Sequence, residues 1–304
     1  MIIKNLIAII SLSLLCTIVH AWPTKNITLI VPYPPGGPAD VIARAAGPDL
    51  ESILKTNVVV LNIVGGSNLV AIRQVLSREN DDHTFIFSTD EFINGPILQN
   101  TKTYDEFVMT NLVGTVPYVL FSNTNTTLKI FKSSVKYQEN INIGVGLVSG
   151  GPNFLIDALR KTSKLNISTI PYKGASPLLV DVLGGHVTYG AVVPFAISDL
   201  VSANKITPIL VSSKSRSAAY PNTPTAHELG FKNTNIITWY AAFSRKDTSD
   251  EAKTKFSDAM HLIIANNIKF NTFKTNGMDL QNLTGPSVNK FYDNEVSKYT
   301  QYKK

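Results

Sequence analysis

The chain has 304 residues, of which 44% are hydrophobic and 16% are charged, so it can bury one large core or two medium ones. Its formal net charge is +6, and the lysines are spread along the sequence. No basic run with interleaved aromatic residues is present, which argues against a nucleic-acid partner. The five histidines are scattered without metal-ligand spacing, and no phosphate-loop signature occurs, so neither a metal nor a cofactor is expected.

Residues 1–21 have the pattern of a secretory signal peptide. Lys4 supplies a positive start, Leu6 to Val19 is apolar, and Val19-His20-Ala21 ends the run with residues typical of a cleavage site. We therefore expect cleavage before Trp22 and a periplasmic mature protein. A retained anchor and a lipid on Cys16 are the alternatives. Cys16 is the only cysteine, so the mature chain would contain no disulfide.

The first chemical motif is a strand, a glycine turn and a helix start. Ile27 to Val31 is typical of a buried strand, and Asp40 opens a helix after a turn that contains Tyr33, Pro35, Gly36 and Gly37. The first N–H groups of a helix lack intrahelical partners, and the macrodipole adds positive charge there, so such a turn can bind an anion. Glycines also let the backbone approach a ligand. The alternative is that the glycines serve only the turn.

The next elements continue this alternation. Asn57 to Val64 reads as a second strand, Leu69 to Leu76 as a helix, and Thr84 to Thr89 as a third strand. The third strand ends in the hydroxyls of Ser88 and Thr89, where ligand contacts usually lie in an open α/β sheet. The alternating order predicts a parallel, doubly wound sheet.

A second lobe repeats the order after the extended run Val113 to Phe121. A strand from Ile141 to Val148 leads into another glycine turn and a helix, and a short strand from Ile167 leads into a further turn. Two glycine-lined helix starts, one in each lobe, indicate a ligand held between facing helix ends. The second-lobe candidates for ligand contact are Ser149, Gly150, Gly151, Asn153, Tyr172, Lys173 and Gly174.

The chain then returns to the first lobe. Ile236 to Phe243 is a second extended crossing, Ser249 caps a helix that runs to Asn266, and closing helical pieces follow. We therefore expect one lobe from residues 22–115 and 240–304 and the other from residues 116–239. Lobe closure would hinge at the two crossings.

Several short motifs stand in a fixed order along nearly all of the mature chain. They are Val31 to Gly37 with Asp40, Tyr104-Asp105, Val113 to Pro117, Pro171 to Gly174, Leu183 to Gly185, Pro221 to Thr225 and Trp239. In this order the set resembles the Bug-type substrate-binding receptors of tripartite tricarboxylate transport systems. Two stretches depart from the family pattern: Asn62 to Asn68 stands where the family usually has an Asn-Arg-Pro-Gly-Ala-Gly-Gly-like run, and Phe154 stands where a histidine often follows the second turn.

The resemblance implies a two-lobe, flytrap-like periplasmic-binding-protein fold of the α/β class, each lobe a mostly parallel sheet flanked by helices. It also implies a small carboxylate held at the loops Tyr33 to Asp40 and Ser149 to Asn153, and a chain that is a receptor and not an enzyme. The expected partners are transporter subunits in the membrane or a sensor kinase, and the receptor itself would be a monomer.

Several of these residues can have either a ligand-binding role or a purely structural one. Asp40 can bind a ligand or serve as a helix-start acid, and Arg44 one turn later is expected to form a surface pair with it. Tyr33 and Tyr172 can line the cleft or pack in the core, and Lys173 can attract an anion or stay solvated. The alternative function is an exported α/β enzyme acting on a carboxylate, which would require a nucleophile–base or acid–base pair in the cleft, such as His186 or His227 beside Asp40 or Ser149.

Overall fold

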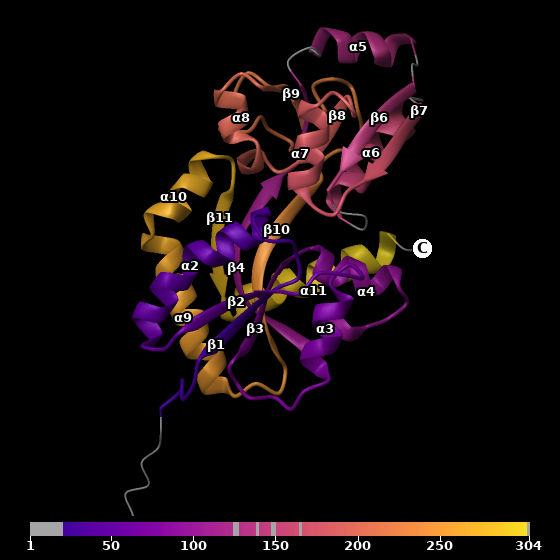
Figure 1. Cartoon of the computed structure of the whole chain (residues 1–304). Helices are drawn as coiled ribbons and strands as arrows, with labels where there is room; N and C mark the ends of the chain where they lie inside the picture. Colours follow the sequence, from indigo (N-terminus) through magenta and orange to yellow (C-terminus); the bar gives the residue numbers. More distant parts are fainter. Residues whose placement is uncertain (1–20, 124–127, 138–139, 147–149, 164–165, 303–304) are drawn as a thin grey trace, which may run out of the picture.

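The computed structural model describes residues 21–123, 128–137, 140–146, 150–163 and 166–302. These residues form two lobes, each built on its own β-sheet, with one lobe stacked above the other and two extended crossings between them (Figure 1). One sheet has six strands in the order β11-β4-β10-β3-β1-β2, and the other has five in the order β7-β6-β8-β5-β9. The α/β two-lobe fold expected from the sequence is confirmed.

The six-stranded sheet contains the strands of the predicted alternation of strands and helices, which form the first part of the described chain. Strand β1 pairs in parallel with β2 on one side and β3 on the other, whereas β10 and β11 run antiparallel to β4. Its strands are β1 (Ile27–Val31), β2 (Val58–Asn62), β3 (Thr84–Thr89), β4 (Phe107–Pro117), β10 (Ile237–Arg245) and β11 (Asp279–Thr284). Its helical elements are α2 (Pro38–Leu54), α3 (Leu69–Leu76), α4 (Glu91–Leu98), η1 (Thr103–Glu106), α9 (Asp250–Asn266), α10 (Ile268–Thr275) and α11 (Gly285–Tyr302).

The five-stranded sheet is also mixed. Strand β6 pairs in parallel with β7 and β8, and β5 runs antiparallel to β8 and β9. Its strands are β5 (Val119–Asn123), β6 (Asn140–Val145), β7 (Asn166–Pro171), β8 (Tyr189–Val192) and β9 (Ile206–Val211). Its helical elements are α5 (Leu128–Tyr137), α6 (Gly151–Ser163), α7 (Ala175–Leu183), η2 (Pro194–Ala196) and α8 (Ser198–Ser202).

Both sheets are thus more mixed than the mostly parallel sheets expected from the sequence. The difference has a topological cause, because a chain that crosses to the other lobe and returns enters a sheet from the opposite end. The parallel strands are those joined by helices, as βαβ units require. The antiparallel partners are the crossing strands β4, β5 and β10 and the closing strand β11.

Side-chain alternation places apolar groups on both faces of the six-stranded sheet. On β3, Phe85 and Phe87 belong to the core beneath α2 and α9, whereas Ile86 belongs to the core beneath α3, α4 and α11. Phe85 stacks on Phe256 of α9 with ring centroids 3.8 Å apart. Both faces are therefore covered by helices, as the apolar run of β3 suggested.

The chain passes from one sheet to the other at Tyr118, which separates β4 from β5. Here the backbone N–H of Tyr118 donates to the hydroxyl of Ser212 at 2.8 Å, and that hydroxyl donates in turn to the carbonyl of Ile236. Ser212 thus ties the outgoing crossing to the returning one. The predicted lobe boundaries at residues 115/116 and 239/240 lie close to these crossings and stay a prediction.

Among the helices of the described residues, none is both long enough and apolar enough to pass through a membrane.

Candidate functional site

A cavity of about 110 Å³ lies between the two lobes. Since roughly 10–15 Å³ of such space holds one water molecule, the cavity has room for a small solute. Both lobes contribute to its lining: Tyr33, Pro34, Pro35, Gly37, Pro38, Ala39, Thr89, Thr238 and Tyr240 from the six-stranded side, and Tyr118, Gly146, Pro152, Lys173, Gly174, Ala175, Ser176, Pro177, Ala191, Val192 and Val193 from the five-stranded side and the crossing.

The first wall is the turn between β1 and α2. Gly37 is the N-cap of α2 and lines the cavity together with Pro38, so the amino end of this helix lies at the cavity wall. Asp40 lies just inside the helix and holds the turn in place. Its carboxylate accepts hydrogen bonds from the backbone N–H of Gly36 at 2.9 Å, from Arg44 at 3.0 Å and from Asn62 at 2.9 Å.

Tyr33 joins this turn to the end of β3. Its hydroxyl lies 2.7 Å from the Thr89 hydroxyl and 3.2 Å from that of Ser88, and it accepts a hydrogen bond from the Asn68 side chain at 3.3 Å. Burial raises the pKa of Tyr33 far above its usual value, so its hydroxyl is neutral at physiological pH. The Tyr33 ring therefore has both roles considered from the sequence, since it lines the cavity and is also 93% buried, its exposed fraction being 7%.

The opposite wall contains two more helix starts. Pro152 lies in the first turn of α6, and Gly174 is the N-cap of α7 with a φ of +114°, a conformation that L side chains rarely adopt. A Cβ atom placed on Gly174 would lie 3.5 Å from Cγ of Pro34 in the other lobe. The amino ends of α2, α6 and α7 thus meet at one cavity, which concentrates positive helix-dipole potential there.

Tyr118 is one of several lining residues that were not expected from the sequence, together with Thr238 and Tyr240. It is 2% exposed, and its hydroxyl has no hydrogen-bond partner among the described residues. Its ring lies against the start of α6, because a Cβ atom on Gly151 would come within 2.2 Å of Cε2 of Tyr118. The sequence shows Tyr118 only as one aromatic residue in a long extended run. Its place at the crossing depends on how the two sheets meet.

Asp90 lies beneath the same region, immediately after β3. Its carboxylate accepts hydrogen bonds from the hydroxyl of Thr238, from Asn94 at 3.2 Å and from the Tyr299 hydroxyl at 3.4 Å. Burial is the main cause that raises the pKa of Asp90 to about 6, and the charge of Glu295 adds to the shift. Thr238 lines the cavity, so this buried carboxyl is one hydrogen bond away from the site.

The residues expected from the sequence divide into three groups. Those that line the cavity are Tyr33, Pro35, Gly37, Thr89, Lys173 and Gly174. Those in the same loops but outside the lining are Gly36, Asp40, Ser88, Gly150, Gly151, Asn153 and Tyr172. Ser149 lies outside the described residues.

Several residues of the second group already have structural partners. Ser88 is fully buried and donates to the Asn68 side chain at 2.5 Å, and the Tyr172 hydroxyl donates to Asp181 at 2.7 Å. Gly151 allows the Tyr118 ring to lie against α6. These residues pack behind the lining and position it. They would therefore affect ligand binding only by changing the positions of the lining residues.

The lining contains little chemistry for catalysis. Lys173 is its one charged side chain, and neither His186 nor His227 belongs to it. Within the described ranges, no group of three or more histidine, cysteine, aspartate or glutamate residues could hold a metal ion. The arrangement of hydroxyls, prolines and helix ends suits the binding of an anion.

Comparison with known proteins agrees with this geometry. The model of the tripartite tricarboxylate transporter family receptors matches residues 42–303. This chain belongs to that family. The receptor is 27% identical to the protein BugT of Bordetella pertussis over 236 residues, which are 75% of this chain and 72% of BugT. The Bug-type resemblance expected from the sequence is confirmed.

Solved structures show the same fold. The periplasmic binding protein BugD superposes with a TM-score of 0.83 at 21% identity, covering 92% of this receptor and 97% of BugD. A Rhodopseudomonas palustris protein with adipate gives a TM-score of 0.84 at 20% identity, with 92% and 96% covered. MatC of the same organism with bound malate gives 0.79 at 21% identity, with 92% and 99% covered. These neighbours thus include a periplasmic binding protein and two proteins with a bound carboxylate, and their likeness shows that this chain has the same fold.

Proposed function

We propose that this chain is an extracytoplasmic receptor that binds a small carboxylate between its two lobes and presents it to a tripartite-type transporter or a sensor protein in the membrane. The supporting observation is the cavity at which the amino ends of α2, α6 and α7 meet. The structures of relatives that hold malate and adipate support the same ligand class. The receptor binds and releases its ligand without changing it.

The residue types that line the cavity favour one kind of carboxylate over others. It consists mainly of proline, alanine, valine and tyrosine, with Lys173 as the single charged side chain. Such walls favour an acid with a compact apolar body over one that carries many hydroxyl groups. One carboxylate would bind the unpaired N–H groups of the helix ends. A second carboxylate would lie toward Lys173.

Closure of the lobes would follow binding. The crossings at Tyr118 and before Ile237 are the covalent connections across which the lobes can rotate, and Ser212 links them. Because Gly174 and Pro34 already approach each other across the cavity, a bound ligand would join both walls. A membrane partner could then distinguish the closed receptor from the open one.

A binding panel tests this proposal. Trp22 to Lys304 would be titrated by calorimetry and by thermal shift with adipate, malate, hexanoate and the neutral diamide of adipate. A ligand at 100 times its dissociation constant stabilises the fold by about 2.7 kcal/mol. We expect binding of at least one acid, none of the diamide, and no new product after prolonged incubation. Binding of the diamide as tightly as adipate, or consumption of an acid, would contradict the receptor proposal.

Lys173 provides a sharper comparison. Replacing it with methionine keeps the length of the side chain and removes its charge. We expect Lys173→Met to weaken adipate several-fold and to leave hexanoate unchanged, because only the second carboxylate is placed near the ammonium group. Lys214→Met is the matched control, since Lys214 does not line the cavity. If Lys173→Met weakens the binding of adipate and hexanoate equally, the Lys173 ammonium group does not bind the second carboxylate.

A further inference from the structure

Trp22 fills a socket at the base of the first lobe. Ala21 is exposed, whereas Trp22 is only 6% exposed. Its indole packs on His83 with ring centroids 5.7 Å apart and on Phe85 at 6.2 Å, and its Nε1–H donates to the carbonyl of Asp82 at 2.8 Å. The first two described residues therefore differ sharply in exposure, on either side of the peptide bond between Ala21 and Trp22.

An acidic group faces the backbone nitrogen of Trp22. The nitrogen donates to Oε1 of Glu251 at 3.2 Å, and Nζ of Lys255 donates both to the carbonyl of Trp22 at 3.0 Å and to Glu251 at 2.8 Å. Glu251 lies in the first turn of α9, where the helix dipole also favours a negative charge. The charged and titratable groups around the nitrogen are Glu251 and Lys255 on α9 and Asp82 and His83 on the loop before β3.

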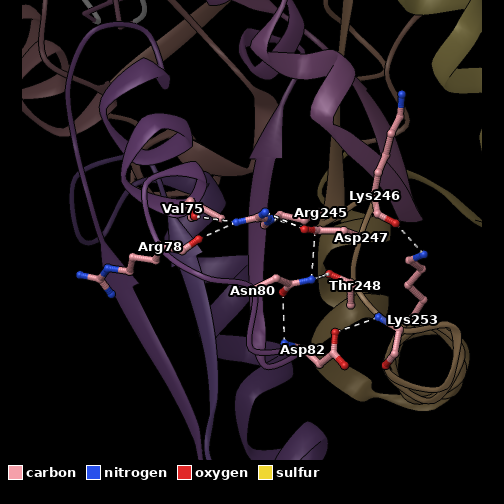
Figure 2. Close-up of polar contacts among 10 residues, drawn as sticks. Val75, Arg78, Asn80, Asp82, Arg245, Lys246, Asp247, Thr248 and Lys253 are labelled. Carbon is pink, nitrogen blue, oxygen red and sulfur yellow. Dashed lines mark hydrogen bonds and ion pairs between the residues drawn. The ribbon is translucent and has the colours of Figure 1, made fainter.

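The walls of this socket are held together by a separate polar network (Figure 2). The Asp82 carboxylate accepts a hydrogen bond from the backbone N–H of Ser249 at 2.8 Å. Asn80 donates to Asp247 at 3.0 Å, and Arg245 binds the same carboxylate at 2.9 and 2.6 Å. The loop that receives the indole and the start of α9 that carries Glu251 are thus fixed to each other by contacts that do not involve Trp22.

We propose that the α-ammonium group, which the cleavage expected after Ala21 would release on Trp22, binds the Glu251 carboxylate. In the cleavage, water adds across the amide bond, so that Ala21 gains a carboxylate and the Trp22 nitrogen leaves as an amine. The amine takes up a proton at neutral pH because α-amino groups have a pKa of roughly 8. A neutral N–H donor thereby becomes a cation with three donors beside an acid.

Processing and folding are linked in this arrangement. Before cleavage, the Trp22 nitrogen gives Glu251 one neutral hydrogen bond, and Glu251 is otherwise paired with Lys255. After cleavage, the same carboxylate lies between two cations. The mature chain thus gains a charge-assisted contact that the uncleaved chain lacks. The contact joins the amino terminus to α9, more than two hundred residues away in the sequence.

The first experiment compares two forms of the protein. One begins at Trp22, released from a fusion partner that leaves no extra residue, and the other carries an acetylated Gly-Ser extension before Trp22. Glu251→Gln is introduced into both, with Asp250→Asn as the matched control. The Asp250→Asn substitution removes the same charge from the same helix turn. Asp250 pairs with Lys253 and does not contact Trp22.

The expected result is a difference between the two forms. Glu251→Gln should lower the Tm of the Trp22-first protein by about 1–2 °C more than that of the extended protein, because this side chain is partly exposed and its ion pair is weak. Asp250→Asn should affect both forms equally. An equal effect of Glu251→Gln on both forms would overturn the proposal.

The protonation of the amine gives an independent readout. Glu251 should raise the pKa of the Trp22 α-amino group above its usual value of roughly 8, and Glu251→Gln should bring it back, as followed by NMR of a selectively labelled Trp22. The extra stability is then fully present below pH 8 and is lost as the pH rises through the raised pKa. An unshifted pKa, or an exported protein whose intact mass does not begin at Trp22, would contradict the proposal.

Discussion

The carboxylate of Asp40 accepts a hydrogen bond from the backbone N–H of Gly36 at 2.9 Å, so the helix start holds its own preceding turn. The remaining capacity of the carboxylate is taken by Arg44 and Asn62. Asp40 does not line the cavity. Of the two roles considered for this residue, the structure favours the supporting one, and the ligand would reach it only through the backbone of the turn.

Asp40→Ala should therefore lower the free energy of unfolding by about 2 kcal/mol, since it leaves the Gly36 N–H and the Arg44 guanidinium without their acceptor. Asp40→Asn should cost less, because the amide oxygen can still accept from Gly36. Urea denaturation measures both changes. Arg44→Ala is the control for the exposed ion pair and should cost less than 1 kcal/mol. An Asp40→Ala variant as stable as wild type would disprove the supporting role.

The pH dependence of Asp40 has a definite sign. Burial alone would raise its pKa, but the hydrogen bonds from Arg44, Gly36 and Asn62 hold the pKa below its usual value of 3.8. The stabilisation is thus present above pH 3.8 and is lost as the pH falls through the lower, folded-state pKa. Asp40→Asn should remove this acid-labile part of the stability, which unfolding curves between pH 5 and 2.5 would reveal.

Replacing Tyr118 should change ligand affinity without lowering the stability of the receptor. Its buried hydroxyl has no hydrogen-bond partner within the described ranges, so Tyr118→Phe should leave the stability of the ligand-free receptor unchanged or slightly higher. If a bound acid accepts a hydrogen bond from this hydroxyl, the same variant should bind about 10-fold more weakly, as expected for one lost hydrogen bond. Chemical denaturation and calorimetry separate the two effects.

Tyr292 is the matched control for this experiment. Its buried hydroxyl donates to the carbonyl of Tyr104 at 2.9 Å, away from the cavity. Tyr292→Phe should lower stability by about 1 kcal/mol and leave affinity unchanged, which is the reverse of the Tyr118 pattern. A Tyr118→Phe variant that loses stability and keeps its affinity would show that the hydroxyl has a structural partner and not a ligand.

Local sequence signals accounted for much of the fold. The turn before α2 was predictable because Pro34, Pro35, Gly36 and Gly37 punctuate the chain, and Ser249 caps α9 as expected by accepting from the backbone N–H of Ala252. The predicted pairing of Arg44 with Asp40 is also confirmed. Each of these features depends on residues within four positions of one another.

Features that depend on distant contacts were not predictable in this way. Neither the short helix α4 nor strand β11 was expected from the sequence, because their segments lack clear periodicity. Strand β11 pairs with β4, which lies far earlier in the chain, and α4 packs on α11 near the carboxyl end as well as on its neighbours. Tyr118 and Thr238 line the cavity because two crossings, more than a hundred residues apart, meet there. Their neighbours in sequence are apolar strand residues, so no local pattern distinguishes them.

Gly151 tests the contact between α6 and the crossing. A Cβ atom at this position would lie 2.2 Å from Cε2 of Tyr118, so Gly151→Ala must displace the ring or the helix. We expect the variant to lose 1–3 kcal/mol of stability, about the cost of overpacking a core, and to bind acids more weakly. Adding Tyr118→Leu should recover part of that stability by removing the ring. Independent, additive losses in the double variant would rule out the proposed contact.

Asp90 provides a pH-dependent test with the opposite sign to Asp40. Its pKa is raised to about 6, mainly by burial, whereas an unfolded chain would titrate near 3.8. The folded protein therefore binds the extra proton between these values, and its stability should fall as the pH rises from 4 to 6. Asp90→Asn, which keeps an acceptor for Thr238, should flatten this part of the stability profile.

The comparison with wild type isolates the Asp90 contribution, because the carboxylates with lowered pKa, such as Asp40 and Asp247, give the reverse slope in both proteins. Asp157→Asn is the control, since this exposed carboxylate pairs only with its helix neighbour Arg160 among the described contacts. Thr238 joins Asp90 to the cavity, so ligand affinity should show the same pH window in wild type and lose it in Asp90→Asn. If the stability difference between wild type and Asp90→Asn stays constant from pH 4 to 7, the carboxyl does not titrate in that range and cannot couple protons to the site.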